Sequence, residues 1–369
     1  MSTSPPRPQA RPKVALVMAG GTGGHIFPAM AVAQALRERG WRVHWLGAPG
    51  SAEKPSMESR LVPPQGFAFE TIDFGGVRGK GFKTLLLLPL RLLKAFAQSL
   101  AVVRRVRPDV VLGFGGYVTF PGGLMSVLLG KPLVLHEQNS VAGLANKMLA
   151  RLAQRVYTAF PDALPGAAWI GNPLRAPFLA QPAPAARYAG RSGPLRLLVV
   201  GGSLGARGLN EVVPQALALL PAAQRPVVTH QSGAAQIDAL RANYAAAGVE
   251  ATLLPFIDDV ASAYAEADVL VARAGASTVT ELAAVGVPAV FVPFPSAVDD
   301  HQTTNARFLV DAGAGWLAQQ RDLTPRKLAD LISTMERPTL VQMGEKAKHM
   351  EKTEAVNIMV QACEELSQP

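Results

Sequence analysis

The chain of 369 residues is poor in cysteine, in aromatic side chains and in long apolar runs. Cys363 is its only cysteine, so an internal disulfide is excluded, and no Cys and His residues have structural zinc spacing. The apolar stretch 14–19 is too short, and too soon followed by glycine, for a signal peptide. We therefore expect a protein that stays in the reducing interior of the cell. Residues 1–12 are rich in proline and basic residues, and we expect them to form a disordered tail.

Several nucleotide-binding signatures are also missing. No Gly-x-x-x-x-Gly-Lys-Ser/Thr sequence occurs, which disfavours a P-loop hydrolase. A dinucleotide site needs an acidic residue about 20 residues beyond its glycines, where this chain has Trp45-Leu46-Gly47 and Gln231-Ser232. No Asp-x-Asp pair is present to hold a divalent metal on a diphosphate. We expect no metal and no cofactor, so helix starts and arginines would have to neutralise a bound diphosphate.

Positive charge, by contrast, is abundant. Lys and Arg number 36 against 27 Asp and Glu, which gives a formal net charge of +9 and a pI near 9.9. Such a balance favours an anionic partner: nucleic acid, phospholipid or a diphosphate-bearing substrate. Aromatic residues are only 6% of the chain, with no stacking platform for single strands, so we do not expect nucleic acid.

Short Val- and Leu-rich runs, each followed by a helical segment, predict strands buried on both faces of parallel sheets. The runs fall into two series, 14–19, 43–46, 110–112, 133–135 and 156–159, then 195–200, 227–230, 269–272 and 289–292. Between them, 172–194 is too broken by proline for regular structure and is expected to be a linker. The fold class is therefore α/β, with two doubly wound Rossmann-like domains facing a central cleft that holds the ligand. A helical tail from Gly344 onward could pack on either domain.

The segment 75–107 differs from its surroundings. A leucine block spanning 85–93 is flanked by basic residues, and Arg91, Lys94 and Pro89 interrupt it, which disfavours a spanning helix. A helix lying on an anionic membrane surface avoids burying those charges. We prefer this interpretation because the apolar block and the basic flanks occur together, while an ordinary core helix with a solvated basic face remains the alternative.

Glycine-rich turns between a strand and a helix occur at 20–24, 113–116 and 201–205. Such turns let the backbone approach a phosphate, and the following helix start offers free N–H groups. Each turn taken alone could be a tight connection without a ligand. Together they predict a bound phosphate compound.

Two further positions carry candidate chemistry. His25 should lie in the first turn of a helix beginning near Ile26, where the helix dipole favours the neutral imidazole that a general base needs. Its alternative role is a hydrogen bond to the loop. Glu281 could accept hydrogen bonds from ribose hydroxyls, or could close a capping box with Thr278.

Read together, these segments resemble the bacterial undecaprenyldiphospho-muramoylpentapeptide β-N-acetylglucosaminyltransferases, which are glycosyltransferases of the GT-B fold. The resemblance runs from about Lys13 to the carboxyl terminus. It is carried by Gly20-Gly21-Thr22-Gly23-Gly24-His25, Gly115-Gly116-Tyr117, His136-Glu137-Gln138-Asn139, Gly171-Asn172-Pro173-Leu174-Arg175, Gly201-Gly202-Ser203, Arg273-Ala274-Gly275-Ala276 with Glu281, and Asp300-His301-Gln302.

The resemblance implies inverting transfer of N-acetylglucosamine from UDP-N-acetylglucosamine to the muramoyl 4-hydroxyl of lipid I, giving lipid II for peptidoglycan. It implies His25 as the catalytic base, Thr22, Gly23, Gly24 and Asn139 at the donor and acceptor sugars, and Arg175 and Ser203 near the diphosphate. Uridine, ribose and phosphate would be held by Ile257, Ala276, Ser277, Thr278, Val279, Thr280 and Glu281, and Gln302 would meet the sugar hydroxyls.

The same resemblance implies an acceptor- and membrane-facing domain at 13–172, completed by a helix at 345–369, and a UDP-sugar donor domain at 173–344. The enzyme would lie peripherally on the cytoplasmic face of the inner membrane. Residues 75–107 would bind the anionic membrane surface, and the enzyme would also bind its undecaprenyl-linked acceptor. Leu204 stands where many relatives carry Gln, and His301 stands where some relatives carry a second Gln beside Gln302. Another UDP-sugar lipid glycosyltransferase or a UDP-N-acetylglucosamine epimerase remains an alternative.

Overall fold

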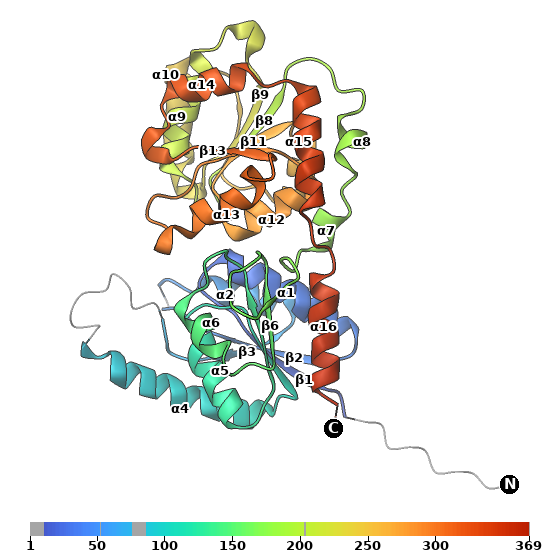
Figure 1. Cartoon of the computed structure of the whole chain (residues 1–369). Coiled ribbons are helices and arrows are strands. Elements are labelled where there is room, and N and C mark those ends of the chain that lie inside the picture. Colours follow the sequence, from blue (N-terminus) through green and yellow to red (C-terminus); the bar gives the residue numbers. More distant parts are fainter. Residues whose placement is uncertain (1–10, 52, 76–85, 203, 369) are drawn as a thin grey trace, which may run out of the picture. The chain divides into compact units, whose positions relative to one another are not determined.

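The structure is a computed structural model that describes residues 11–51, 53–75, 86–202 and 204–368 (Figure 1). These residues form two compact units. The first contains the described parts of Met1–His136, Gly143–Tyr157 and Val356–Pro369, and the second contains Glu137–Ala142 and Thr158–Ala355. The chain therefore passes between the units more than once.

A seven-stranded sheet of order β3-β2-β1-β4-β5-β6-β7 begins in the first unit. Its strands are β1 (Val14–Met18), β2 (Arg42–Gly47), β3 (Ala68–Thr71), β4 (Val110–Gly113), β5 (Leu133–Glu137), β6 (Arg155–Thr158) and β7 (Ala168–Trp169). Strand β1 pairs in parallel with β2 and β4, with Ala15 opposite both Val43 and Val110. Because β1 is buried on both faces, its sequence is apolar at every position.

Helices cover this sheet on both faces. They are α1 (Gly23–Glu38), α2 (Met57–Leu61), the 3-10 turn η1 (Pro63–Gln65), α4 (Leu88–Val106), α5 (Thr119–Leu128), α6 (Leu144–Leu149) and α16 (Ala355–Leu366). Helix α4 packs on α5 and α5 on α6, and their apolar residues join Leu16 and Met18 in one core cluster. Helix α16 is tied to the first unit by Arg39, whose guanidinium lies 3.0 Å from the Glu364 carboxylate.

The second unit has a six-stranded sheet of order β10-β9-β8-β11-β12-β13. Its strands are β8 (Arg196–Val200), β9 (Val227–Gln231), β10 (Thr252–Leu254), β11 (Val269–Ala272), β12 (Ala289–Phe291) and β13 (Gly315–Leu317). Alternate residues of β11 enter two different clusters, since Val269 and Val271 pack on one face and Leu270 and Ala272 on the other. Both faces are therefore covered, as in a doubly wound domain.

The helices of this unit occupy both faces of the sheet. They are α7 (Ala176–Leu179), α8 (Pro184–Tyr188), α9 (Arg207–Ala218), α10 (Ile237–Ala247), α11 (Val260–Glu266), α12 (Ala276–Val285), α13 (His301–Val310), α14 (Pro325–Ser333) and α15 (Arg337–His349), with 3-10 turns η2 (Ala222–Gln224), η3 (Ala234–Gln236), η4 (Val298–Asp300) and η5 (Gln320–Asp322). The tail predicted at 345–369 is divided, because α15 lies in the second unit and most of α16 in the first.

The predicted fold class, two doubly wound α/β domains, is confirmed by the two parallel sheets. All nine predicted strands are present, whereas β3, β7, β10 and β13 were missed. The prediction that 172–194 lacks regular structure is wrong, because α7 and α8 lie within it. Each begins with a proline in its first two positions, where the missing N–H costs nothing.

Glycine at 205 is required by two separate constraints. Gly205 has a φ of +76°, and a Cβ added there would lie 1.6 Å from the Ser232 carbonyl oxygen. Gly248 has a φ of +61° with nothing within 4 Å of an added Cβ. Gly248→Ala should thus cost about 1 kcal/mol, from backbone strain alone.

Gly205→Ala should cost more than about 3 kcal/mol of unfolding free energy, because β9 must also move away from the β8 turn. Urea unfolding of both variants measures the difference. Equal losses would show that the close approach of the two turns is not a constraint.

Candidate functional site

Most of the predicted site residues follow the carboxyl ends of strands, and residues 22–25 and 276–281 lie at the points in the two sheets where the strand order reverses. In the first unit this point lies between β1 and β4, and in the second between β8 and β11. Open parallel sheets bind ligands at such positions. Residues 22–25 follow β1 in the first unit, and the remaining predicted residues belong to the second.

In the first unit the turns after β1 and β4 are packed directly on one another. A Cβ added to Gly116, whose φ is +87°, would lie 2.4 Å from the Gly20 carbonyl oxygen. A Cβ added to Gly115 would lie 2.9 Å from Cε1 of His25. The His25 ring therefore rests against a glycine that no larger residue could replace without displacing it.

Helix α1 begins at Gly23, earlier than the predicted start near Ile26, so the predicted start is wrong. Gly23 and Gly24 are consequently helical, and His25 is the third residue of the helix, still in its first turn. Thr22 is the N-cap residue, but its side chain makes no cap hydrogen bond. The Thr22 hydroxyl is thus not used to close the helix start, and the first backbone bond of the turn runs from the His25 N–H to the Thr22 carbonyl at 3.1 Å.

Helix α12 begins in the same manner in the second unit. Its N-cap is Gly275, which has no side chain to cap with, and its first intrahelical bond runs from Val279 N–H to the Gly275 carbonyl. The amides of residues 276–278 therefore have no acceptor within the helix. By contrast, α2, α11 and α14 are closed by side chains of Ser56, Asp259 and Thr324. An uncapped helix start that follows a parallel strand is suited to anion binding.

The capping box considered for Thr278 and Glu281 is wrong, because Thr278 is the third helical residue and not the cap. Glu281 instead lies in the second turn, 9% exposed, and its Oε1 is 4.0 Å from Nη2 of Arg175. Burial raises the pKa of Glu281 to about 7, and the positive charge of Arg175 opposes part of that rise. The Arg175 guanidinium also stacks on Phe178, 5.0 Å from the ring centre.

The other residues of the run 276–281 have different surroundings. Ala276 and Val279 are buried in the core, and the Thr280 hydroxyl donates to the Ala276 carbonyl. The Ser277 Oγ is buried and has no hydrogen-bond partner among the described residues. Ser277, the backbone amides and Glu281 are therefore the groups of this run that remain for a ligand.

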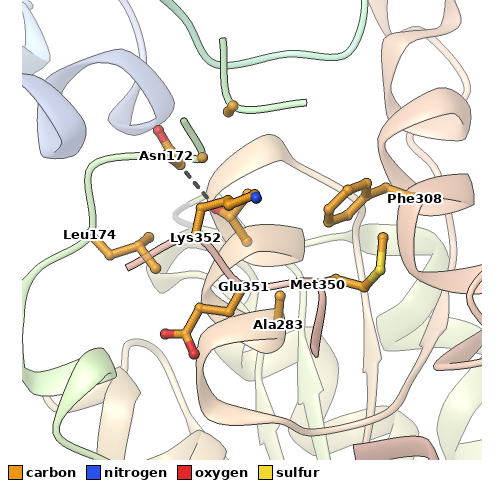
Figure 2. Close-up of a pocket in the computed structure, with 10 residues that line it drawn as sticks. Asn172, Leu174, Ala283, Phe308, Met350, Glu351 and Lys352 are labelled. Atoms are coloured by element: carbon orange, nitrogen blue, oxygen red, sulfur yellow. Dashed lines mark hydrogen bonds between the residues drawn. The ribbon is translucent and has the colours of Figure 1, made fainter. Parts of the chain in front are cut away.

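Asn172 ties the segment before Arg175 to α12. Its Nδ2 donates to the Thr280 hydroxyl at 3.2 Å, the bond drawn as a dashed line in Figure 2. The cavity in that figure is lined by Asn172, Leu174, Thr280 and Glu351 among others, and all its lining residues belong to the second unit. The side chain of Asn172 thus fixes the backbone from which Arg175 reaches Glu281.

The turn after β8 is held by polar side chains from β9 and η3. Gln231 Nε2 donates to the Gly202 carbonyl at 3.1 Å and to the Pro255 carbonyl at 3.3 Å. Gln236 Nε2 donates to the Leu204 carbonyl. The Leu204 side chain itself is 82% exposed. Ile257, two residues after Pro255 in the chain, is buried. Ser203, predicted near the diphosphate, lies outside the described residues.

Asn139 and Gln302 come from segments that the structure brings together. Both the backbone N–H and Nδ2 of Asn139 donate to Oε1 of the buried Glu137. The next residue, Ser140, bonds through its N–H and hydroxyl to Asn305 on α13. Gln302 lies at the start of α13, where its Oε1 accepts the Phe294 N–H. Sequence reasoning did not detect this docking of 137–142 on α13.

Arg273 was included in a motif but its role was not predicted. The side chain is 9% exposed and donates to the carbonyls of Val292 and Pro293 and to Gln320 Oε1. It also stacks over Phe294 at 5.6 Å. Arg273 therefore shapes the loop after β12 that meets Gln302. Among the described residues, no group of three or more His, Cys, Asp and Glu could hold a metal ion.

Comparison with known proteins matches both halves of the chain to one glycosyltransferase family. A model of the glycosyltransferase family 28 N-terminal domain matches residues 15–158, and a model of the family 28 C-terminal domain matches residues 196–361. The first match runs from β1 to the end of β6, and the second runs from β8 into α16, so that together they include parts of both units.

Similar full-length proteins share one name, UDP-N-acetylglucosamine--N-acetylmuramyl-(pentapeptide) pyrophosphoryl-undecaprenol N-acetylglucosamine transferase. The protein of Paracidovorax citrulli is 72% identical over 96% of this chain and 99% of its own. That of Ralstonia nicotianae is 63% identical over 95% of this chain and 96% of its own.

Solved structures agree with this similarity. The crystal structure of Acinetobacter baumannii MurG has a TM-score of 0.83 at 42% identity, covering 96% of this chain and all of that one. The glycosyltransferase VinC in complex with DTDP has a TM-score of 0.63 at 16% identity, covering 95% of this chain and all of its own, and shows likeness of fold alone.

Burial of Glu281 makes a pH-dependent contribution to stability that can be measured. The folded-state pKa of about 7 lies above the ordinary value of 4.5, so the contribution is fully present below pH 4.5 and is lost as pH rises through 7. Glu281→Gln should therefore gain about 3 kcal/mol relative to wild type between pH 4.5 and pH 8. Urea unfolding across that range gives the difference.

Glu250→Gln, on the surface of the same unit, controls for the general effect of removing one negative charge. A stability difference for Glu281→Gln that does not change with pH would show that Glu281 is not held in a costly ionised form.

Proposed function

Because the chain belongs to glycosyltransferase family 28, we propose that it transfers N-acetylglucosamine from UDP-N-acetylglucosamine to N-acetylmuramyl-pentapeptide pyrophosphoryl-undecaprenol. The chain is a UDP-N-acetylglucosamine-dependent glycosyltransferase of peptidoglycan synthesis, in agreement with the expectation from its motifs. The product is lipid II.

One observation carries the chemistry of this assignment. The helices that follow the strands at the reversal points of the two sheets have no side-chain cap, and they include α1 after β1 and α12 after β11. Donor and acceptor each carry a diphosphate, so the reaction needs two anion sites. The starts of α1 and α12, one in each unit, can supply two such sites.

The donor is held by the second unit. The amides of residues 276–278 and the Ser277 hydroxyl receive the diphosphate, and Arg175 adds a full positive charge beside it. The Glu281 carboxylate accepts hydrogen bonds from the ribose hydroxyls, and Ile257 contacts the base. Ser203 also contributes near the diphosphate. These contacts stabilise UDP as the leaving group when the bond from the anomeric carbon to the phosphate oxygen breaks.

The acceptor sugar is held by residues 22–24. Its 4-hydroxyl attacks the anomeric carbon from the side opposite to UDP, which inverts the configuration. His25 takes the hydroxyl proton as the new bond forms, so that the attacking oxygen never carries a full positive charge. Gln302 and Asn139 contact the sugar hydroxyls. The contact of the His25 ring with Gly115 supports this role because it limits the positions the ring can take.

Helix α4 supports binding to the membrane surface. Its carboxyl half packs into the core through Ala95, Ser99, Val102 and Val103, and Leu88 and Leu92 pack against the same core cluster, whereas Leu90 and Leu93 are exposed. Leu86, Leu90 and Leu93 are 69%, 65% and 64% exposed, and the neighbouring Arg91 is also exposed. An ordinary core helix would bury such leucines. The basic residues and Leu85 within 76–85 lie outside the described residues.

In the part of the chain that the structure describes, none of the helices is both long and apolar enough to cross a membrane. We place the enzyme peripherally on the cytoplasmic face of the inner membrane, where the nucleotide donor is made and the lipid acceptor is anchored. Apolar side chains that enter the interface and cations that meet anionic headgroups would add their contributions.

The direct test is a reaction of purified protein with labelled UDP-N-acetylglucosamine and a lipid I analogue, without added metal. Transfer of label to the lipid and release of UDP are expected. An epimerase would convert the donor without the lipid, and a glycosyltransferase of other specificity would leave this lipid unlabelled. Either outcome would refute the proposal.

Removal of the proposed base should separate turnover from donor binding. We expect His25→Ala to lower kcat about 100- to 10,000-fold, because the hydroxyl proton loses its acceptor. UDP affinity by calorimetry should be unchanged, since the donor is held by the other unit. His44→Ala, on β2 of the same unit, is the matched control. A His25→Ala variant with full turnover would exclude the residue as the base.

Exposed leucines on α4 and just before its start should control membrane attachment. Leu86, Leu90 and Leu93 changed together to Ser should abolish cosedimentation with vesicles rich in anionic phospholipid, because the apolar contribution is lost. The control replaces Leu219 and Val227, which are 51% and 60% exposed in the second unit, by Ser. If the α4 variant sediments like wild type, membrane contact through this helix is disproved.

A further inference from the structure

A buried carboxylate lies directly behind the turn that carries residues 22–25. Glu58, on α2, is 2% exposed. Its Oε2 accepts the Gly21 N–H at 3.1 Å, and its Oε1 accepts the Ala48 N–H at 3.2 Å. Within the described ranges it forms no ion pair. A carboxylate in such a position depends on these backbone donors, since burial without them is strongly unfavourable.

Neighbouring glycines leave space for this side chain. A Cβ added to Gly20 would lie 2.5 Å from Oε1 of Glu58, and one added to Gly47 would lie 2.9 Å from its Cγ. The glycine turn after β1 and the end of β2 therefore both pack against the side chain of Glu58. Glu58 thus links three segments, the β1 turn, the β2 end and α2.

The hydrogen bond to Gly21 determines the direction of a peptide group. The peptide between Gly20 and Gly21 is planar and trans, so an N–H that points to Glu58 turns the Gly20 carbonyl the opposite way. That carbonyl is the atom against which Gly116 packs. Gly21 has a φ of +90°, and Thr22, the N-cap of α1, follows it. Glu58 therefore sets the path by which the chain enters α1.

A second contact extends this effect to the proposed base. The turn after β4 touches the Gly20 carbonyl through Gly116 and the His25 ring through Gly115. If the Gly20 peptide rotates, Gly116 loses its contact with the Gly20 carbonyl and the turn after β4 can shift. Gly115 would then no longer restrict the position of the His25 ring. Displacement of a reacting group by about 1 Å can lower a rate about 100-fold.

From these contacts we propose that Glu58 is a positioning residue, which acts through Gly21 to hold residues 22–25 in the conformation that receives the acceptor and aims His25. The inference rests on the proposed function, because it assumes that these residues meet the acceptor. Glu58 itself touches no substrate. Its role is to keep the amide of Gly21 turned inward so that the amides and hydroxyl beyond it face outward.

Glu58→Gln tests this with little change of shape. The amide can accept only one of the two N–H groups, because its NH₂ would oppose the other. We expect kcat/KM for the lipid acceptor to fall about 10- to 100-fold, whereas UDP affinity by calorimetry stays within about twofold. Glu58→Asp, which keeps the charge but is one methylene shorter, should not restore turnover.

Asp109→Asn is the matched control. Asp109 accepts the Val14 N–H at 2.8 Å, so it anchors the other end of β1 in the same manner but away from the glycine turn. An equal loss of acceptor kcat/KM in both variants would reduce Glu58 to a fold-stabilising role and overturn the proposal. Full activity of Glu58→Gln, full rescue by Glu58→Asp, or a parallel loss of UDP affinity would also overturn it.

Hydrogen exchange separates this inference from the proposed function. Amides of residues 20–25 should exchange faster in Glu58→Gln than in wild type or Asp109→Asn, with no substrate present. If wild type transfers no sugar, the proposed function fails, and exchange alone decides whether Glu58 holds the turn. If the amides of residues 20–25 exchange at the same rate in Glu58→Gln as in wild type, Glu58 is not a positioning residue, whether or not wild type transfers sugar.

Discussion

The structure depends on backbone amides that are left without partners where a helix begins directly after a parallel strand. In both units the chain leaves a buried strand through glycine, enters a helix, and uses no side chain to close the helix start. An amide that is not satisfied locally is available to an anion, and the helix dipole adds to the attraction. Glycines with positive φ at Gly21, Gly116 and Gly202 make the close turns possible. Binding at these points therefore uses the backbone, with side chains adding selectivity.

Polar side chains behind these turns keep the amides in place. Glu58 supports the turn after β1, Gln231 and Gln236 support the turn after β8, and Arg273 supports the loop after β12. Each bonds mainly to backbone groups, so each fixes a loop path without needing to touch a ligand. Glu281 is different, because its buried carboxylate has a raised pKa and, in the described part of the chain, Arg175 is the cation beside it. A group held at such a cost is typical of a binding site. The candidate site thus combines helix-start amides that no side chain caps with polar side chains that hold the surrounding loops by hydrogen bonds to their backbone.

Much of the fold could be predicted from the sequence, because central strands of a parallel sheet are apolar on both faces. The strands at or near the edges, such as β3 and β10, were missed because they are short and partly polar. Proline usually ends a helix, so a proline-rich segment does not predict α7 and α8, although their prolines occupy first-turn positions. The glycine turns and the motif residues could be found from spacing and resemblance. The docking of Ser140 on Asn305 and the contact of Glu58 with Gly21 could not, because they join residues far apart in the chain.

The proposed donor site requires that the uncapped start of α12 bind the donor diphosphate through its backbone amides. The most direct measurement is the amide chemical shift of each residue during a titration of UDP into isotope-labelled protein. We expect the amide signals of Ala276, Ser277 and Thr278 to shift and saturate together, without added metal, while those at the capped start of α14 stay unchanged. Saturable UDP binding that leaves residues 276–278 unperturbed, or no binding at all, would contradict it.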